Sequence, residues 1–319
     1  MLYTNLHALI NQKFKKHKVA AEDIELLRPQ LTQQNVITLL NDIINQPELI
    51  KRIANRSYLH TLGFYKLVLI DSSKDTKDFS YKTQVRLHLW KPDNDSVPVV
   101  ESLHEHSFDF VSTVLTGKLE NQSFIREDMS EDEKRVLDHL LNIIEVLNNE
   151  EKAFLESQIE ILLTQNLEIL GSEQFKKQKL EEHIDITKFK EITKFNDSEL
   201  KILVNLQGFF KSNRIAGERK DYKHILEKHI SLKPYKVESI KQGDFYFHPY
   251  QLPHRLFYDN KEYNSTILVT SHIPENPEGG SFQRPTHNEE GEQDYSKKPI
   301  SEKELVFLLE EYVDYLSKS

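Results

Sequence analysis

The chain of 319 residues has no cysteine, few glycines (9) and prolines (11), and a single tryptophan. Without cysteine there is no disulfide, thiolate ligand or cysteine nucleophile, so any metal must be held by imidazole, carboxylate or water. Low glycine and proline with 38% hydrophobic and 29% charged residues excludes a fibrous or low-complexity chain. The length allows one elaborated domain or two smaller ones.

Long apolar runs and an excess of positive charge are also missing. No run approaches the ~18 to 20 apolar residues of a membrane span, so we expect no membrane insertion. Residues 1–18 lack the apolar stretch and cleavage site of a secretory signal, which favours a cytoplasmic protein. The formal net charge of -9 disfavours nucleic acid as a partner, because phosphate backbones require clustered Lys and Arg.

Short runs rich in β-branched and aromatic residues predict two groups of strands. The runs are 63–71, 82–91, 97–105, 108–116 and 118–126, followed by 235–240, 244–248, 254–259 and 264–272. Because these strands do not alternate with single helices, they favour a double-sheet jelly roll over a parallel α/β sheet. The expected fold is therefore mainly β, with added helices.

Helical periodicity separates the strand groups and flanks them. The expected parts are an N-terminal helical segment (1–62), a barrel (63–126 plus 235–273), a helical insertion (127–234), and a loop with a C-terminal helix (274–319). Capping-box patterns at Ser130 with Glu133 and at Ser301 with Glu304 mark two helix starts. The apolar stripes of the insertion face either the core or a dimer contact, so a homodimer is one alternative.

Three histidines form the main candidate site. His104 and His106 are two residues apart in a strand-like run, a spacing that directs both imidazoles to one face. His254 follows a segment that reads as turn, strand and turn. We predict that the three imidazoles hold one metal ion. The alternative is three ordinary histidines that happen to fall on strands and near a turn.

The two histidine segments resemble the two motifs of the cupin family. Residues 103–117 contain the HxH pair and a later glycine, Gly117, which suits the tight turn of a hairpin. In the second segment Pro249 follows Gly243 after five intervening residues, and His254 comes five positions later. The resemblance covers about a dozen defining positions and implies a jelly-roll barrel with a bound metal.

The positions that depart from the cupin pattern point to one branch of the family. Phe110 stands where the family usually has a metal-binding Glu, and Gln251 and Tyr258 replace the usual Gly and Asn of the second motif. A three-His site without the Glu is similar to the thiol dioxygenases, the cysteine dioxygenase-like cupins. This resemblance, over roughly residues 82–126 and 240–272, implies Fe(II); the spacing itself leaves Zn, Mn and Ni as alternatives.

Further side chains are candidates for the pocket around the metal. Arg86, His88 and Trp90 alternate along one predicted strand and share a face, where Arg86 would anchor a carboxylate. The alternative is a solvated face, with the intervening leucines turned to the core. With Arg86 and His88, Tyr246 completes the set of candidate catalytic residues, and for Tyr246 a packing role is equally open.

Two other residues near the motifs, Asp109 and His248, are further possible ligands of the metal. Strand alternation places Asp109 on the face opposite Phe110, which favours a role in the turn over direct ligation. His248 would join the site only if the strand register differed from the family alignment, so we expect it to pack.

Together these features predict an Fe(II)-dependent oxygenase that acts on a small carboxylate or thiol substrate, with O2 as a second substrate. Neutral imidazoles leave the ion's positive charge uncompensated, which favours anionic ligands. Two alternatives stay open. One is a cupin isomerase, decarboxylase or hydrolase that uses the metal as a Lewis acid. The other is a non-enzymatic, metal-containing protein that binds a small molecule or a partner.

Overall fold

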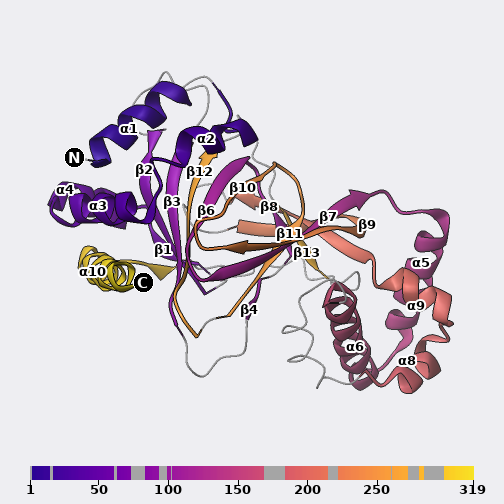
Figure 1. Ribbon diagram of the computed structural model, residues 1–319. Helices are drawn as coiled ribbons and strands as arrows, with labels where there is room; N and C mark the ends of the chain where they lie inside the picture. The colour runs from indigo at the N-terminus through magenta and orange to yellow at the C-terminus, as the bar shows by residue number, and fades with distance from the viewer. Residues whose placement is uncertain are drawn as a thin grey trace.

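The computed structural model has two antiparallel sheets at its centre (Figure 1). It describes residues 2–14, 17–60, 63–72, 83–92, 99–101, 103–168, 184–214, 222–259, 261–271, 280–283 and 298–319. Parts of the predicted strands at 82–91 and 97–105, and most of the predicted loop at 274–300, lie outside the described residues.

Within the described ranges, each sheet has seven strands. The first has the order β10 (Phe245–His248), β6 (Phe110–Thr116), β12 (Asn264–Ser271), β3 (Thr83–Trp90), β2 (Tyr65–Asp71), β1 (Tyr58–Leu59) and β14 (Lys298–Pro299). The second has the order β4 (Val99–Val100), β11 (His254–Tyr258), β5 (His104–Glu105), β13 (Gly280–Gln283), β8 (Leu206–Arg214), β9 (Tyr222–Lys241) and β7 (Lys118–Glu127), and β11 also pairs with β7. This is the predicted double-sheet, cupin-like jelly roll.

Helices from both ends of the chain cover the outer face of the first sheet (Figure 1). They are α1 (Leu2–Lys13), α3 (Gln33–Ile44), α4 (Pro47–Ala54) and α10 (Glu302–Lys318), with the short η1 (Ala21–Asp23) and α2 (Ile24–Leu27) between them in the chain. The predicted capping box at Ser301 and Glu304 starts α10. The predicted N-terminal and C-terminal helices are therefore confirmed.

Strand β3 lies between this helical layer and the barrel interior. Val85, Leu87 and Leu89 are fully buried in the same core cluster as residues of α3 and α10. Because side chains alternate along a strand, Arg86, His88 and Trp90 face the interior. The leucines are therefore turned to the helical core, as in the alternative, while Arg86 and His88 on the inner face are partly buried and Trp90 is buried.

Gly117 forms the turn between β6 and β7, as predicted. Its φ of +77° lies in the left-handed region, and a Cβ at this position would overlap the side chain of Asn264. The β6–β7 hairpin therefore requires glycine here.

The predicted helical insertion is only partly helical. Helices α5 (Glu131–Val146), α6 (Asn149–Glu168), α8 (Ile186–Thr193) and α9 (Asp197–Leu203) are present, with the predicted capping box at Ser130 and Glu133. The prediction of helix beyond residue 205 is wrong, because β8 and most of β9 occupy that region. Their Phe209, Ile230 and Leu232 pack on Phe124 and Phe282, a period-two pattern that the surrounding Lys and Glu residues obscured.

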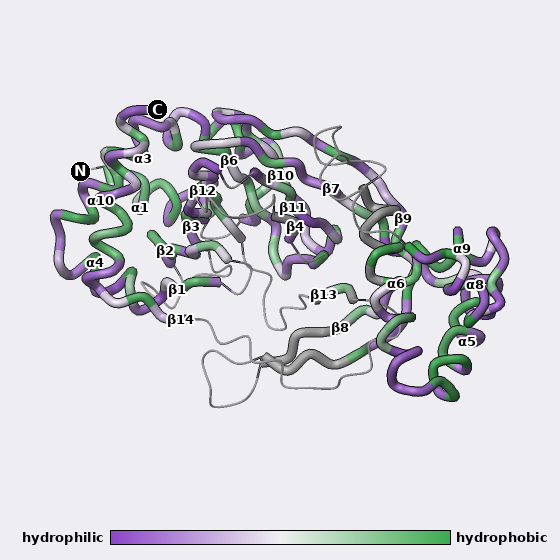
Figure 2. Tube along the Cα trace, turned by 90° about the horizontal axis from the view of Figure 1, so that it is seen from below, coloured by the Kyte–Doolittle hydropathy of each residue, from purple (hydrophilic) through white to green (hydrophobic). Residues whose placement is uncertain are grey.

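The four helices that the structure describes in the insertion form a lobe with its own core. Leu140, Leu155, Phe189 and Leu203 are buried within it. Figures 1 and 2 place the lobe at the end of the β7–β9 ribbon, far from α1, α3, α4 and α10. None of the helices that the structure describes is long and apolar enough to cross a membrane.

Candidate metal site

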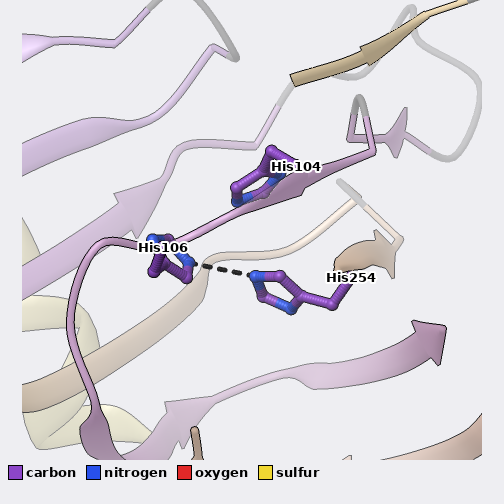
Figure 3. Close-up of side chains that lie close together, drawn as sticks. All are labelled: His104, His106 and His254. Atoms are coloured by element: carbon purple, nitrogen blue, oxygen red, sulfur yellow. Dashed lines mark hydrogen bonds between the residues drawn. The ribbon is translucent and has the colours of Figure 1, made fainter. Parts of the chain in front are cut away.

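His104, His106 and His254 converge on one point inside the barrel (Figure 3). Each offers one ring nitrogen, and these three atoms lie within 4.8 Å of one another. His104 lies in β5, His106 directly follows it, and His254 opens β11, where it pairs with His104. The predicted grouping of the three imidazoles is confirmed, and its size suits a single ion.

Asn121 on β7 orients the third imidazole. Its Oδ1 lies 2.9 Å from Nδ1 of His254, and an amide oxygen can only accept, so Nδ1 carries the proton. Nε2 of His254 then has its lone pair directed at the site, 3.0 Å from Nε2 of His106. A hydrogen bond from outside that fixes the tautomer is the usual support of a metal-binding histidine.

Desolvation keeps two of these imidazoles, His106 and His254, neutral, which is the form that binds metal. Desolvation lowers the pKa of both His106 and His254 well below the usual value, and the neighbouring histidines lower it further. Arg86 and Lys66 add to this effect on His106. The site therefore has a positive surrounding potential and no proton to displace from these two ligands at neutral pH.

Aromatic and turn residues surround the ligands. The Phe110 ring lies 5.2 Å from the ring centre of His106, so a side chain that cannot bind metal fills the family's Glu position. His248 stacks on Phe110, and its Nε2 lies 3.0 Å from the carbonyl oxygen of Leu252. Asp109 accepts a hydrogen bond from the backbone N–H of Tyr250 at 2.8 Å. The His248 ring also lies 4.0 Å from that of His254, but neither His248 nor Asp109 belongs to the three-imidazole group, and their roles stay predictions.

The three candidate catalytic residues all lie on inner strand faces. The Arg86 guanidinium lies 4.5 Å above the Phe108 ring, and its Nε donates to Oε1 of Gln84. His88 packs on Phe64. Tyr246 packs on Phe110, and burial raises the pKa of its hydroxyl to about 12. Their catalytic roles stay predictions.

Sequence reasoning missed two residues, Asn121 and Glu101. Glu101 follows β4 and is buried, and its Oε1 has no hydrogen-bond partner among the described residues. Burial raises the pKa of its carboxyl to about 8. A lone acidic residue after an apolar run was its only local signal, whereas Asn121 could be found only from the pairing of β7 with β11.

Comparison with known proteins gives no family assignment. No protein-family model and no curated protein matches the chain. Among solved structures, a 7S globulin from Momordica charantia has 9% identity and a TM-score of 0.31, with 82% of this chain and 44% of that chain covered. An oxalate oxidase has 11% identity, a TM-score of 0.28 and coverage of 81% and 72%. An oxalate decarboxylase variant from Bacillus subtilis has 10% identity, a TM-score of 0.27 and coverage of 71% and 29%.

The chain spans less than half the length of the 7S globulin. At such low scores these similarities carry no argument about activity, and no specific relationship to thiol dioxygenases emerges from them. The strand order and the three histidines instead define the class of protein: a cupin-like jelly roll with a candidate metal centre.

Proposed function

We propose that the protein is a mononuclear, non-haem Fe(II)-dependent oxygenase that acts on a small anionic substrate. The observation that carries the proposal is the group of three converging imidazoles, of which His254 is buried and the other two are partly buried, and which includes no carboxylate among the described residues. Three neutral ligands do not offset the charge of a divalent ion, so an anionic substrate is favoured at the open positions. The cupin resemblance favours iron.

Arg86 supports an anionic substrate. Its guanidinium stacks on Phe108, which in turn lies 5.0 Å from the His106 ring, so a fixed positive charge lies beside the histidine group. A planar guanidinium pairs well with a carboxylate through two parallel hydrogen bonds. In this proposal Arg86 orients the substrate, and His104, His106 and His254 hold the ion.

The donor set fits such an ion. The lone pair of His254 is directed inward by Asn121, and the low pKa values of His106 and His254 keep both rings available. A bound Fe(II) would supply the electrons for reaction with O2. The surrounding Phe110, Tyr246 and His248 keep bulk water away from the bound substrate.

The test is metal analysis followed by turnover with and without O2. We expect about one iron per chain and O2 uptake with a member of a panel of small carboxylates and thiols. Both should be lost in His104→Ala and His254→Ala. They should be retained in His17→Ala, which removes an exposed histidine outside the site.

Two results would contradict the proposal in different ways. Absence of stoichiometric metal from wild-type protein expressed with iron would overturn the metal centre. Turnover that proceeds equally under anaerobic conditions would retain the centre and replace oxygenation by Lewis-acid chemistry.

A further inference from the structure

Three buried polar atoms belong to Trp90 and to two residues beside it, inside the barrel and next to the candidate metal site. They are Nε2 of His88, Nε1 of Trp90 and Oε1 of Glu101, and none has a hydrogen-bond partner among the described residues. His88 and Trp90 come from the inner face of β3. Glu101 comes from the opposite sheet, where its backbone N–H donates to the carbonyl of Leu256.

The contacts of Trp90 connect the two sheets at this place. Its ring lies 5.2 Å from that of Tyr258 on β11 and 5.0 Å from that of Phe64. The indole is also near Glu101, although this approach falls short of a hydrogen bond of normal geometry. The three polar atoms therefore share one aromatic surround.

Such an arrangement is unfavourable unless something binds there. Each buried polar group without a partner destabilises a protein by about 1 to 3 kcal/mol, and native structures contain few of them. Aromatic walls with a small number of convergent polar atoms are typical of small-molecule sites. The three atoms here are thus suited to a ligand that brings its own donors and acceptors.

The three polar groups themselves are uncharged at neutral pH, and the cations of Lys66 and Arg86 lie close enough to His88 to help keep its ring neutral. Burial raises the pKa of Glu101 to about 8, so its carboxyl is protonated and can both donate and accept. Burial also lowers the pKa of His88 well below its usual value. The nearby Tyr246 and Tyr258 hydroxyls have raised pKa values and stay protonated. An ionic group would be poorly matched to this region.

We propose that Glu101, Trp90 and His88 form a subsite for an uncharged planar ring that carries a hydroxyl or amide group. The ring packs against the group that Phe64, Trp90 and Tyr258 form by contact with one another, and its polar group bonds to the carboxyl, the indole N–H and the imidazole. His88 and His104 are close enough to interact electrostatically, so the subsite adjoins the three histidines. The idea that this ring is part of the substrate rests on the proposed function. The binding of the ring at the subsite is independent of it.

The only tryptophan of the chain, Trp90, reports directly on this subsite. Metal-free protein is titrated with phenol and benzamide while tryptophan fluorescence is recorded. Toluene, which lacks polar groups, and cyclohexanol, which lacks a planar ring, serve as comparison probes. We expect a saturable change with phenol or benzamide, and binding at least about tenfold weaker for both comparison probes, equivalent to about 1.4 kcal/mol.

Substitutions separate a binding role from a structural one. Glu101→Gln keeps a neutral donor and acceptor and should retain binding within about threefold, whereas Glu101→Leu should weaken it at least about tenfold. Glu120→Gln is the matched control, because Glu120 pairs with Lys118 and alternates with the inward-facing Asn121. Trp90→Phe removes the indole N–H, and its weaker binding is measured by ligand-observed saturation-transfer NMR.

The inference is overturned if wild-type protein binds neither phenol nor benzamide, or if Glu101→Leu binds them as wild type does. Metal content measured on the same variants distinguishes the two proposals. We expect Glu101→Leu to retain full metal occupancy, so loss of ring binding alone leaves the metal centre intact. Failure of metal binding with saturable ring binding contradicts the proposed function and leaves this subsite in place.

Discussion

The buried carboxyl of Glu101 makes folding stability depend on pH in a specific way. Burial raises its pKa from 4.5 to about 8 in the folded protein. The folded state then holds this proton more tightly than the unfolded chain, so the stabilisation is fully present below pH 4.5 and is lost as the pH rises through 8. Between about pH 5 and pH 9 the loss amounts to about 4 kcal/mol for a single group with these two pKa values.

Glu101→Gln removes this titration and leaves a neutral side chain of the same size. We expect the wild-type free energy of unfolding to fall by about 4 kcal/mol relative to Glu101→Gln between about pH 5 and pH 9. Urea denaturation of metal-free protein at several pH values measures the difference, and all other titrating groups cancel in it. Parallel curves for the two proteins, within about 0.5 kcal/mol, would refute a buried, protonated Glu101.

Three further substitutions test the site and the scaffold. Asn121→Leu should lower metal affinity about 10- to 100-fold by calorimetric titration, while Asn121→Asp keeps the acceptor for His254 and retains binding; equal affinities would contradict the orienting role. Phe110→Glu should lower the Tm of the metal-free protein by burying a charge and give a larger metal-induced rise in Tm than wild type, and an unchanged rise would show that the new carboxylate does not reach the ion. Leu309→Ala should destabilise the protein by about 2 to 5 kcal/mol in chemical denaturation without loss of metal binding, and a change below about 1 kcal/mol would contradict the packing of α10 on the sheet.

The histidine group could be predicted because its geometry is largely local. A two-residue spacing on a strand directs His104 and His106 to one face whatever the partner strand, and the second motif supplied His254. The alternation of Arg86, His88 and Trp90 followed from the same rule. The sequence did not show which face of β3 points into the barrel, because that depends on the helices that cover Leu87 and Leu89.

The residues that sequence reasoning missed depend on long-range pairing. Asn121 reaches His254 only through the register of β7 against β11, and Glu101 reaches Trp90 only because the two sheets face each other. The wrong prediction of helix for the residues of β8 and β9 has another cause. Several Lys and Glu residues of β9, such as Glu227, Lys228 and Lys233, are exposed, so the composition resembled an amphipathic helix, whereas the apolar Ile230 and Leu232 alternate with Ser231.

The pairing of β7 with β9 also constrains how the chain can fold. Glu127 and Ser231 are direct partners, so one strand pair closes a loop of about a hundred residues before the sheet that contains His254 is complete. The insertion lobe has its own core and can fold within that loop. Each halving of the effective loop length makes closure about 0.6 kcal/mol more favourable, so the prefolded lobe brings the ends of β7 and β9 together and promotes assembly of the metal site at some distance from it.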